Sequence, residues 1–534
     1  MKRSIIFLLV SIYLFHFQII NSCTNILVTK GASTSNSTSV TYAADSHELY
    51  GELYFWPASD CPDGAMLKIY DWDTGKYLGE IKQVNHTYQV VGNMNEHQLT
   101  IGETTFTGRT ELQDTTAIMD YGSLIYITLQ RATTAREAIK IMDKLVTEYG
   151  YYSTGESFSI ADPNEVWIME IIGKGPGNKG ANWVARKIPD GYISAHANQA
   201  RITTFPLNDK ENTLYSDDII EFARDKGFFK GEDKDFDFTA AFAPIDYSAL
   251  RFCESRVWSA FRKVTHGIDK YEKYAMGDVT QDRMPLWVKP DKKLSIQDIM
   301  ALMRDHFEGT PMDMTKDIGA GPFACPYRWR PLTWELDSLT YINERAISTQ
   351  QTAFSFISQA RNNLPDHIGG VLWFGVDDTY STCYMPIYCG ITEPPKSLAV
   401  GTGSFHEFTW ESAFWTFNFV SNYTYSRYSD MIKDVQEVQS EFENKFFTFQ
   451  PAIEKAALEL YQSNPDYARE YITEYSSKQV STVRDRWQKL GEELIYNYLD
   501  GNPKDKNGNV THPPYPEHWY KRIVEETGDF FLIK

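Results

Sequence analysis

Short apolar segments separated by polar turns recur along most of the chain. The first two are Asn25–Val28 and Val40–Ala43, with a run rich in Gly, Ser, Thr and Asn between them. Apolar runs of this length, bounded by turn residues, are typical of strands joined as hairpins. Serial hairpins of this kind indicate antiparallel sheet. Further hairpins are predicted at residues 90–91 with 99–101, 158–160 with 166–169, 183–185 with 192–194, and 371–376 with a strand near 384.

Helical spacing appears between the hairpins. Thr134 and Glu137 have the spacing of a capping box, apolar residues recur at helical spacing from Ile139 to Tyr149, and Gly150 supplies a stop signal. A second helix is predicted at about 348–361. Helices interspersed with antiparallel hairpins favour a layered α+β sandwich over an all-β or a Rossmann-like fold.

The C-terminal residues 426–534 show a different pattern, with apolar residues at helical spacing and acidic residues on the other faces. Further helical stretches follow Pro451 and Pro465. An apolar stripe of this kind usually packs against the protein's own core. We therefore predict a helical C-terminal region. The stripe consists of Met431, Val435, Val438, Phe442 and Phe446.

Residues 1–22 have the pattern of a secretory signal peptide. Lys2 and Arg3 precede an almost unbroken apolar run, Ile5–Phe15. A membrane anchor needs about 20 consistently apolar residues, and His16 and Gln18 interrupt this run. No later segment is long and apolar enough to span a bilayer. We therefore expect cleavage of the leader, export to the periplasm or the extracellular space, and no stable membrane span.

Charge and cysteine content narrow the function classes. The formal net charge is -19, which disfavours a nucleic-acid partner because nucleic-acid binding needs basic patches. The six cysteines contain no CxxC spacing, so we expect no structural zinc. The sequence predicts no metal and no cofactor. Export would permit at most two disulfides if one cysteine has another task, and their pairing is undetermined.

Cys23 lies where the leader meets the first predicted strand. It admits three interpretations: a lipid attachment site, a disulfide partner, or the first residue of a mature enzyme. Residues 20–23, Ile-Asn-Ser-Cys, loosely match a lipobox, and Ile20 fits signal peptidase I poorly. A lipidated cysteine is commonly followed by a flexible polar tether, however, whereas a strand begins here at Asn25. The strand favours the enzyme, with a surface lipoprotein as the alternative.

Cleavage before Cys23 would give this residue two catalytic groups. A free α-amine has a reference pKa of about 7.7 to 8.0, and a cysteine thiol one of about 8.5. The amine can take the thiol proton and later deliver a proton to a leaving amine, so no separate histidine is required. This chemistry predicts an N-terminal cysteine nucleophile.

Several stretches, among them CTNILVTKGAST, NEHQLTIGETTF and GYISAHANQARI, follow one another in an order that resembles the C69 dipeptidase family, the group that includes secernins and lactobacillar dipeptidase A. The resemblance implies an N-terminal-nucleophile hydrolase with Cys23 as catalyst. It also implies a four-layer αββα sandwich, here residues 23–425, followed by the helical extension 426–534. The stretches are CTNILVTKGAST, VTYAADSHELYGELYFWPA, NEHQLTIGETTF, GESFSIADPNEVWIME, GYISAHANQARI and LWFGVDDTYSTCYMPIY.

More distantly, the pattern is similar to choloylglycine hydrolases and penicillin V acylases. This similarity implies that Asp45 holds the α-amine of Cys23 and that Asn198 donates to the oxyanion. Where those relatives have a second oxyanion asparagine, this chain has Thr105, which is equally well an ordinary strand residue. Their arginine matches Arg251 better than Arg256, because Arg251 precedes a phenylalanine; a surface helix arginine is the alternative.

Together these features predict an exported cysteine dipeptidase that cleaves dipeptides or short peptides through a thioester. Two other functions are compatible with the sequence. One is an N-acyl amide hydrolase of the choloylglycine hydrolase and penicillin acylase type, and the other is a non-enzymatic lipoprotein lipidated at Cys23. The expected partner is a dipeptide or other small amide, and a homo-oligomer is left open.

Overall fold

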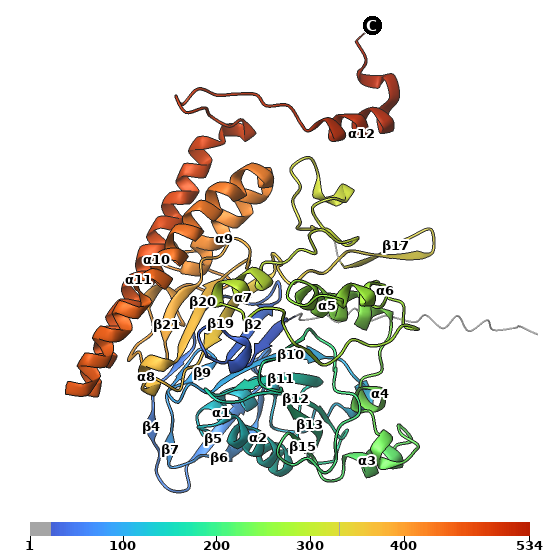
Figure 1. Cartoon of the computed structure of the whole chain (residues 1–534), viewed down its shortest axis with the longest axis vertical. Coiled ribbons are helices and arrows are strands. Elements are labelled where there is room, and N and C mark those ends of the chain that lie inside the picture. Colours follow the sequence, from blue (N-terminus) through green and yellow to red (C-terminus); the bar gives the residue numbers. More distant parts are fainter. Residues whose placement is uncertain (1–22, 330–331, 534) are drawn as a thin grey trace, which may run out of the picture.

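The computed structural model describes residues 23–329 and 332–533. The predicted signal peptide, residues 1–22, lies outside the described residues. Two large β-sheets form the centre of the molecule, with helices on their outer faces (Figure 1). The structure thus confirms a mixed α and β fold built on antiparallel sheets.

The seven-stranded sheet contains the first two strands of the chain, and all its pairings are antiparallel. Its strands in spatial order are β16 (Trp287–Val288), β14 (Ile193–His196), β1 (Asn25–Val28), β2 (Ser39–Asp45), β19 (Thr352–Gln359), β20 (Val371–Val376) and β21 (Met385–Tyr388). The predicted hairpins of β1 with β2 and of β20 with β21 are confirmed.

The eight-stranded sheet is built from the next part of the chain and is also antiparallel. Its strands in spatial order are β15 (Thr213–Tyr215), β13 (Ala181–Lys187), β12 (Val166–Gly173), β11 (Gly155–Ala161), β10 (Thr100–Phe106), β9 (Met94–Asn95), β8 (Val90–Val91) and β3 (Phe55–Trp56). The predicted hairpin of β11 with β12 is confirmed. β8 and β10 are both strands, but each pairs with the short β9 that lies between them.

The two sheets pack face to face, with β2 against β10 and β11. Leu27 and Val40 of one sheet share a core with Ile168 and Val184 of the other. Polar groups also cross this interface, because the ring nitrogens of His196 lie 2.7 Å from the hydroxyls of Thr104 and Ser159. These contacts fix the relative position of the strands that carry the site described below.

Helices cover the outer face of each sheet. On the eight-stranded sheet lie α1 (Tyr121–Leu129) and α2 (Ala135–Tyr149). The predicted start of α2 is confirmed, since the Thr134 side chain accepts a hydrogen bond from the Glu137 backbone, and the helix ends at Gly150 with a φ of 78°. On the seven-stranded sheet lie α5 (Ser255–Arg262), α7 (Ile296–Met303), α9 (Ala413–Thr424), α10 (Tyr428–Ser463) and α11 (Pro465–Asn497).

The C-terminal region is helical, as predicted, and its apolar stripe is buried in the core beneath α10 and α11. The ring of Trp487 stacks on Phe417 of α9 with the ring centroids 4.7 Å apart. Pro451 does not begin a helix but lies inside α10, which continues through it. Beyond residue 501 the chain leaves this core, and α12 (Glu517–Thr527) buries none of its residues (Figure 1).

Two further sequence-based predictions are wrong. Residues 348–361 form no helix but contain β19, a central strand in which every residue is buried. A strand covered on both faces has no polar face, so its apolar spacing does not distinguish it from a buried helix. Residues 183–185 and 192–194 form no hairpin either. Both edges of β13 are occupied by β12 and β15, so the chain crosses at Gly191 into the other sheet, where β14 pairs with β1.

Shorter elements complete the described fold, and no helix among residues 23–329 and 332–533 has the length and apolarity needed to cross a bilayer. These elements are α3 (Ile219–Asp225), α4 (Phe238–Phe242), a π-helical segment (Ala249–Glu254), α6 (Glu272–Ala275), α8 (Asp366–Gly369), the pair β4 (Ser59–Asp60) with β7 (His86–Thr87), the pair β5 (Met66–Tyr70) with β6 (Tyr77–Lys82), and the pair β17 (Thr333–Leu336) with β18 (Leu339–Ile342).

Candidate active site

Cys23 lies just before β1 and is buried, with 3 % of its surface exposed. Its backbone nitrogen donates a 2.9 Å hydrogen bond to Oδ1 of Asn198. Its carbonyl oxygen accepts a 2.6 Å hydrogen bond from Nη1 of Arg256. The residue is therefore held on both sides of its Cα by side chains that are distant in sequence.

Asn198 follows β14 and has a φ of 64°, in the left-handed region that asparagine tolerates better than most residues. Its side-chain amide donates a 2.7 Å hydrogen bond to the carbonyl oxygen of Thr105. Its Oδ1 accepts from Arg256 at 2.8 Å as well as from Cys23. The structure thus brings together Cys23 and Asn198, as the family resemblance implies, while a role in holding an oxyanion stays a prediction.

Arg256, in α5, is the arginine beside Cys23. Its Nη1 donates to the carbonyl oxygen of Cys23 and the hydroxyl of Thr24, and its Nη2 donates to the carbonyl oxygen of Ala197 and Oδ1 of Asn198. Its fifth N–H, on Nε, donates to the carbonyl oxygen of Phe252 in the preceding π-helical segment. Arg251 lies in the preceding π-helical segment and turns elsewhere, donating to Glu344 and, at 2.9 Å, to the sulfur of Met276. Of the two candidates from the sequence, the structure brings only Arg256 to Cys23.

Asp45 lies at the end of β2, beside Cys23 but facing other partners. Its carboxylate is 3.0 Å from the guanidinium of Arg345 and accepts a 2.7 Å hydrogen bond from Thr352, its neighbour on β19. Burial raises the pKa of Asp45 to about 6, against the lowering effect of Arg345. The Cys23 nitrogen donates to Asn198, so the implied contact between the Asp45 carboxylate and that nitrogen stays a prediction.

The thiol of Cys23 faces an acidic, aromatic environment that the sequence did not reveal. Its sulfur lies 3.8 Å from the hydroxyl of Tyr42 and 3.8 Å from Oε1 of Glu103, and Tyr42 donates a 2.5 Å hydrogen bond to that carboxylate. Burial raises the pKa of the Cys23 thiol well above its ordinary value, and the negative charges of Glu103 and Asp45 raise it further. A hydrogen bond from the Asp45 backbone acts in the opposite direction.

Glu103, Tyr42 and Arg345 are the site residues that sequence reasoning missed. For Glu103 a signal was present, because a glutamate in a strand otherwise expected to be buried must have a partner or a function. Arg345 lies 300 residues from Asp45 and belongs to no motif, so only the fold brings the two together.

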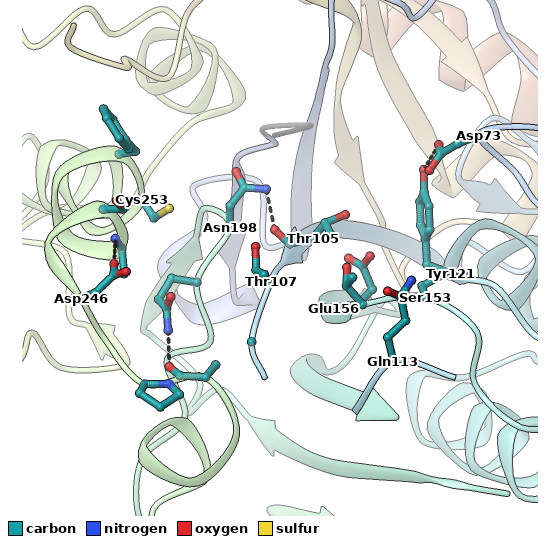
Figure 2. Close-up of a pocket in the computed structure, with 18 of the residues that line it drawn as sticks. Asp73, Thr105, Thr107, Gln113, Tyr121, Ser153, Glu156, Asn198, Asp246 and Cys253 are labelled. Carbon is teal, nitrogen blue, oxygen red and sulfur yellow. Dashed lines mark hydrogen bonds between the residues drawn. The ribbon is translucent and has the colours of Figure 1, made fainter. Parts of the chain in front are cut away.

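A pocket of about 720 Å³, within the range of small-molecule sites, lies next to the residues that hold Cys23, although Cys23 is not itself one of its lining residues. Asn198 and Arg256, which hold Cys23, form part of its wall. Figure 2 shows Asn198 and Thr105 near the middle of this pocket, with Glu156 beside them. Thr105 therefore lies at the site, through both its carbonyl oxygen and its position in the pocket wall.

All six cysteines lie in the described part of the chain, and all are free thiols. Among the described residues, no group of three or more His, Cys, Asp and Glu side chains is arranged to hold a metal ion.

The geometry places a buried cysteine just before the first strand of a two-sheet sandwich, held by residues that line a pocket of small-molecule size. The chain belongs to peptidase family C69, whose model matches residues 53–441. The matched segment contains Thr105, Asn198, Arg251 and Arg256 and begins after Cys23 and Asp45.

Similar curated proteins carry dipeptidase names. A "Probable dipeptidase" of Latilactobacillus sakei is 31% identical over 253 residues, 47% of this chain and 46% of that protein. "Probable dipeptidase B" of Streptococcus pyogenes serotype M1 is 24% identical over 396 residues, 72% of this chain and 71% of that protein. "Dipeptidase A" of Lactobacillus helveticus is 24% identical over 397 residues, 70% of this chain and 77% of that protein. This chain thus spans less than half the length of the first of these relatives.

Proposed function

We propose that this chain is a cysteine dipeptidase whose nucleophile is the thiol of Cys23, freed as the N-terminal residue by cleavage after Ser22. The observation that carries the proposal is the clamp on Cys23, in which Asn198 binds its nitrogen and Arg256 its carbonyl oxygen at the wall of a small-molecule pocket. Membership of family C69 and the dipeptidase names of its relatives support it.

Cleavage would convert the Cys23 nitrogen into an α-amine that Asn198 already positions. This amine takes the thiol proton as the sulfur attacks the scissile carbonyl carbon, and a carbon–sulfur bond forms. The side-chain amide of Asn198 and nearby backbone amides donate to the oxyanion. When the intermediate collapses, the carbon–nitrogen bond breaks and the leaving amine receives the proton. Water then attacks the thioester, releasing the acid and restoring the thiol.

The proposal extends to the fold class of the chain and to the cellular location of the protein. Helix on sheet on sheet on helix is the arrangement that the family resemblance implies for an N-terminal-nucleophile hydrolase, and the packing of α1 and α2 on one sheet and α9 to α11 on the other supports it. The apolar leader supports export to the periplasm or extracellular space.

The test compares Cys23→Ala and Cys23→Ser with Cys389→Ala, whose thiol is also buried but donates to the Asp366 carbonyl, outside the pocket. Each variant is assayed against a set of unmodified dipeptides and an N-acyl amide with an apolar acyl group. We expect Cys23→Ala to lose dipeptide hydrolysis, Cys389→Ala to retain it, and acid-quenched wild-type protein to carry an acyl group on Cys23 by mass spectrometry. Undiminished turnover by Cys23→Ala, or turnover of the acyl amide alone, would overturn the proposal.

A further inference from the structure

Glu156 is a buried carboxyl group that faces the pocket. It lies on β11, none of its surface is exposed, and neither of its carboxyl oxygens has a hydrogen-bond partner of good geometry among the described residues, although the side chains of Glu103 and Thr105 lie close enough to shift its pKa. Figure 2 shows it in the pocket wall, between Thr105 and Tyr121. A buried carboxylate is costly unless it is paired, so Glu156 points to a ligand that would supply the missing donors.

A second buried carboxylate, that of Glu103, lies next to Glu156. Glu156 pairs directly with Thr105 across β10 and β11, which puts Glu103 on the same face of the sheet, at the diagonal position. One oxygen of Glu103 accepts from Tyr42, and the other has no partner among the described residues. Burial raises the pKa of Glu156 well above its ordinary value, and the adjacent Glu103 raises it further. Two adjacent buried carboxyl groups favour a cation with several hydrogen-bond donors, because its charge would allow both of them to ionise.

The charge of the pocket favours a cationic ligand too. Among the described residues that line it, four carry carboxylates and only Arg256 carries a positive charge. All five N–H donors of Arg256 are engaged with Cys23, its surroundings and its own helix, so this guanidinium has no donor left for a substrate anion. The four carboxylates belong to Asp71, Asp73, Glu156 and Asp246.

The position of Glu103 and Glu156 relative to Cys23 indicates which cationic group of a substrate would bind there. In a peptide, the amino-terminal nitrogen lies about 2.5 Å from the first carbonyl carbon, and a sulfur poised for attack lies about 3 to 3.5 Å from that carbon. The ammonium group of a dipeptide under attack therefore lies within about 6 Å of the sulfur. Glu103 Oε1 lies 3.8 Å from the Cys23 sulfur, inside that radius. We propose that Glu103 and Glu156 form the subsite that binds the free α-ammonium group of the substrate.

This subsite rests on the proposed function and sharpens it. An ammonium group donates three hydrogen bonds, enough to reach both carboxylates. An N-acylated peptide presents an uncharged amide there, with one N–H in place of three, and would leave two buried carboxylates without a counter-charge, which is a strong basis for rejection. The enzyme would thus act only on peptides with a free amino terminus and would cleave after the first residue.

The experiment compares a dipeptide with its N-acetyl derivative on wild type, Glu156→Gln and the control Glu165→Gln. Glu165 lies at the far end of the β11–β12 hairpin, pairs with Arg136, and is outside the pocket, so its substitution removes the same charge elsewhere. We expect wild type to prefer the free dipeptide at least a hundredfold in kcat/KM. Glu156→Gln should lose at least tenfold on that substrate, mainly through KM, and nothing on the acetyl form, and Glu165→Gln should match wild type.

A binding measurement separates this subsite from the proposed function. Cys23→Ala is titrated with the same two peptides by calorimetry, which reports recognition whether or not the chain hydrolyses anything. Selective binding of the free dipeptide that Glu156→Gln abolishes in this background supports the subsite, even if wild type proves inactive and the proposed function fails. Equal binding of both peptides, or equal losses on both with Glu156→Gln, overturns the subsite even if wild type is an active dipeptidase.

Discussion

Arg256 donates a 2.6 Å hydrogen bond to the carbonyl oxygen of Cys23 across 233 residues of sequence. The same guanidinium bonds to Oδ1 of Asn198, which in turn accepts from the Cys23 nitrogen. Cys23, Asn198 and Arg256 are therefore joined in a closed set of hydrogen bonds that clamps Cys23. Its orientation depends on the planar, five-donor shape of one arginine, which a lysine cannot reproduce.

The clamp predicts that Arg256→Lys loses activity while Arg251→Lys does not. Losing the hydrogen bonds around Cys23 should cost about 3 kcal/mol in transition-state stabilisation, or about a hundredfold in kcat. Arg251 binds Glu344 and Met276 instead, so its lysine variant should stay within about threefold of wild type. Steady-state kinetics and thermal unfolding of both variants check this. If Arg251→Lys shows the larger loss in kcat, the arginine favoured by the sequence is the functional one.

Reactivity of the thiol should depend on pH in a way that Glu103 controls. Burial and the charge of Glu103 both raise the pKa of Cys23, so alkylation by iodoacetamide should increase as pH rises into the alkaline range. Glu103→Gln removes the negative charge, stabilises the thiolate, and should move the midpoint of the alkylation profile to lower pH. Mass spectrometry of chains that begin at Cys23 measures this, with Glu165→Gln as the charge control. A midpoint that is unchanged, or moves upward, would contradict the assigned contact.

Asp45 should make stability fall as pH rises. Its pKa is raised from 3.8 to about 6 in the folded chain, so the protonated form is the one that folding favours. This contribution is fully present below about pH 4 and is lost as pH rises through about 6, an effect of about 3 kcal/mol. Asp45→Asn also removes the partner of Arg345 and lowers stability overall, but it should lose this pH dependence. Urea unfolding at pH 4.5 and 7.5 tests the difference, and equal changes in wild type and variant would refute it.

The C-terminal helices should be required for folding, whereas the last residues should not. Trp487 of α11 stacks on Phe417, and Glu454 of α10 forms a 2.7 Å ion pair with Arg361. A chain that ends at residue 425 would expose this core and should be insoluble or unfold without cooperativity. A chain that ends at residue 501 removes only α12 and its exposed surroundings and should unfold at the same temperature as the full chain. Cooperative unfolding of the shorter chain would show that residues 426–534 fold as a separate region.

The sequence predicted most of the local structure but not all of the pairing. Strands with one polar face or a clear turn, such as β11 and β12, follow from alternation and turn residues. β19 could not be distinguished from a helix, because a strand buried on both faces lacks the polar positions that reveal a period of two. The turn before Ile193 was predicted correctly. The sheet that the following strand joins could not be predicted, because it depends on which strand edges are already paired with other strands.

The sequence predicted those site residues that lie in the family motifs. Cys23 and Asn198 meet as the family resemblance implied. The resemblance favoured Arg251, whereas the structure brings Arg256 to Cys23, because five residues of helix separate the two arginines by well over one turn. Glu103, Glu156 and Arg345 are ordinary charged residues in sequence. They differ from surface residues only in being buried, and burial follows from the packing of the two sheets on each other.

The pairing of the first strands has a consequence for how the chain is made. β1 pairs with β14, whose partner residues lie near position 195, and β2 pairs with β19, near position 355. β1 and β2 can pair with each other early, but both are synthesised long before β14 and β19 exist, and such non-local pairing slows folding. The clamp on Cys23 likewise cannot form until Asn198 and then Arg256 have been synthesised.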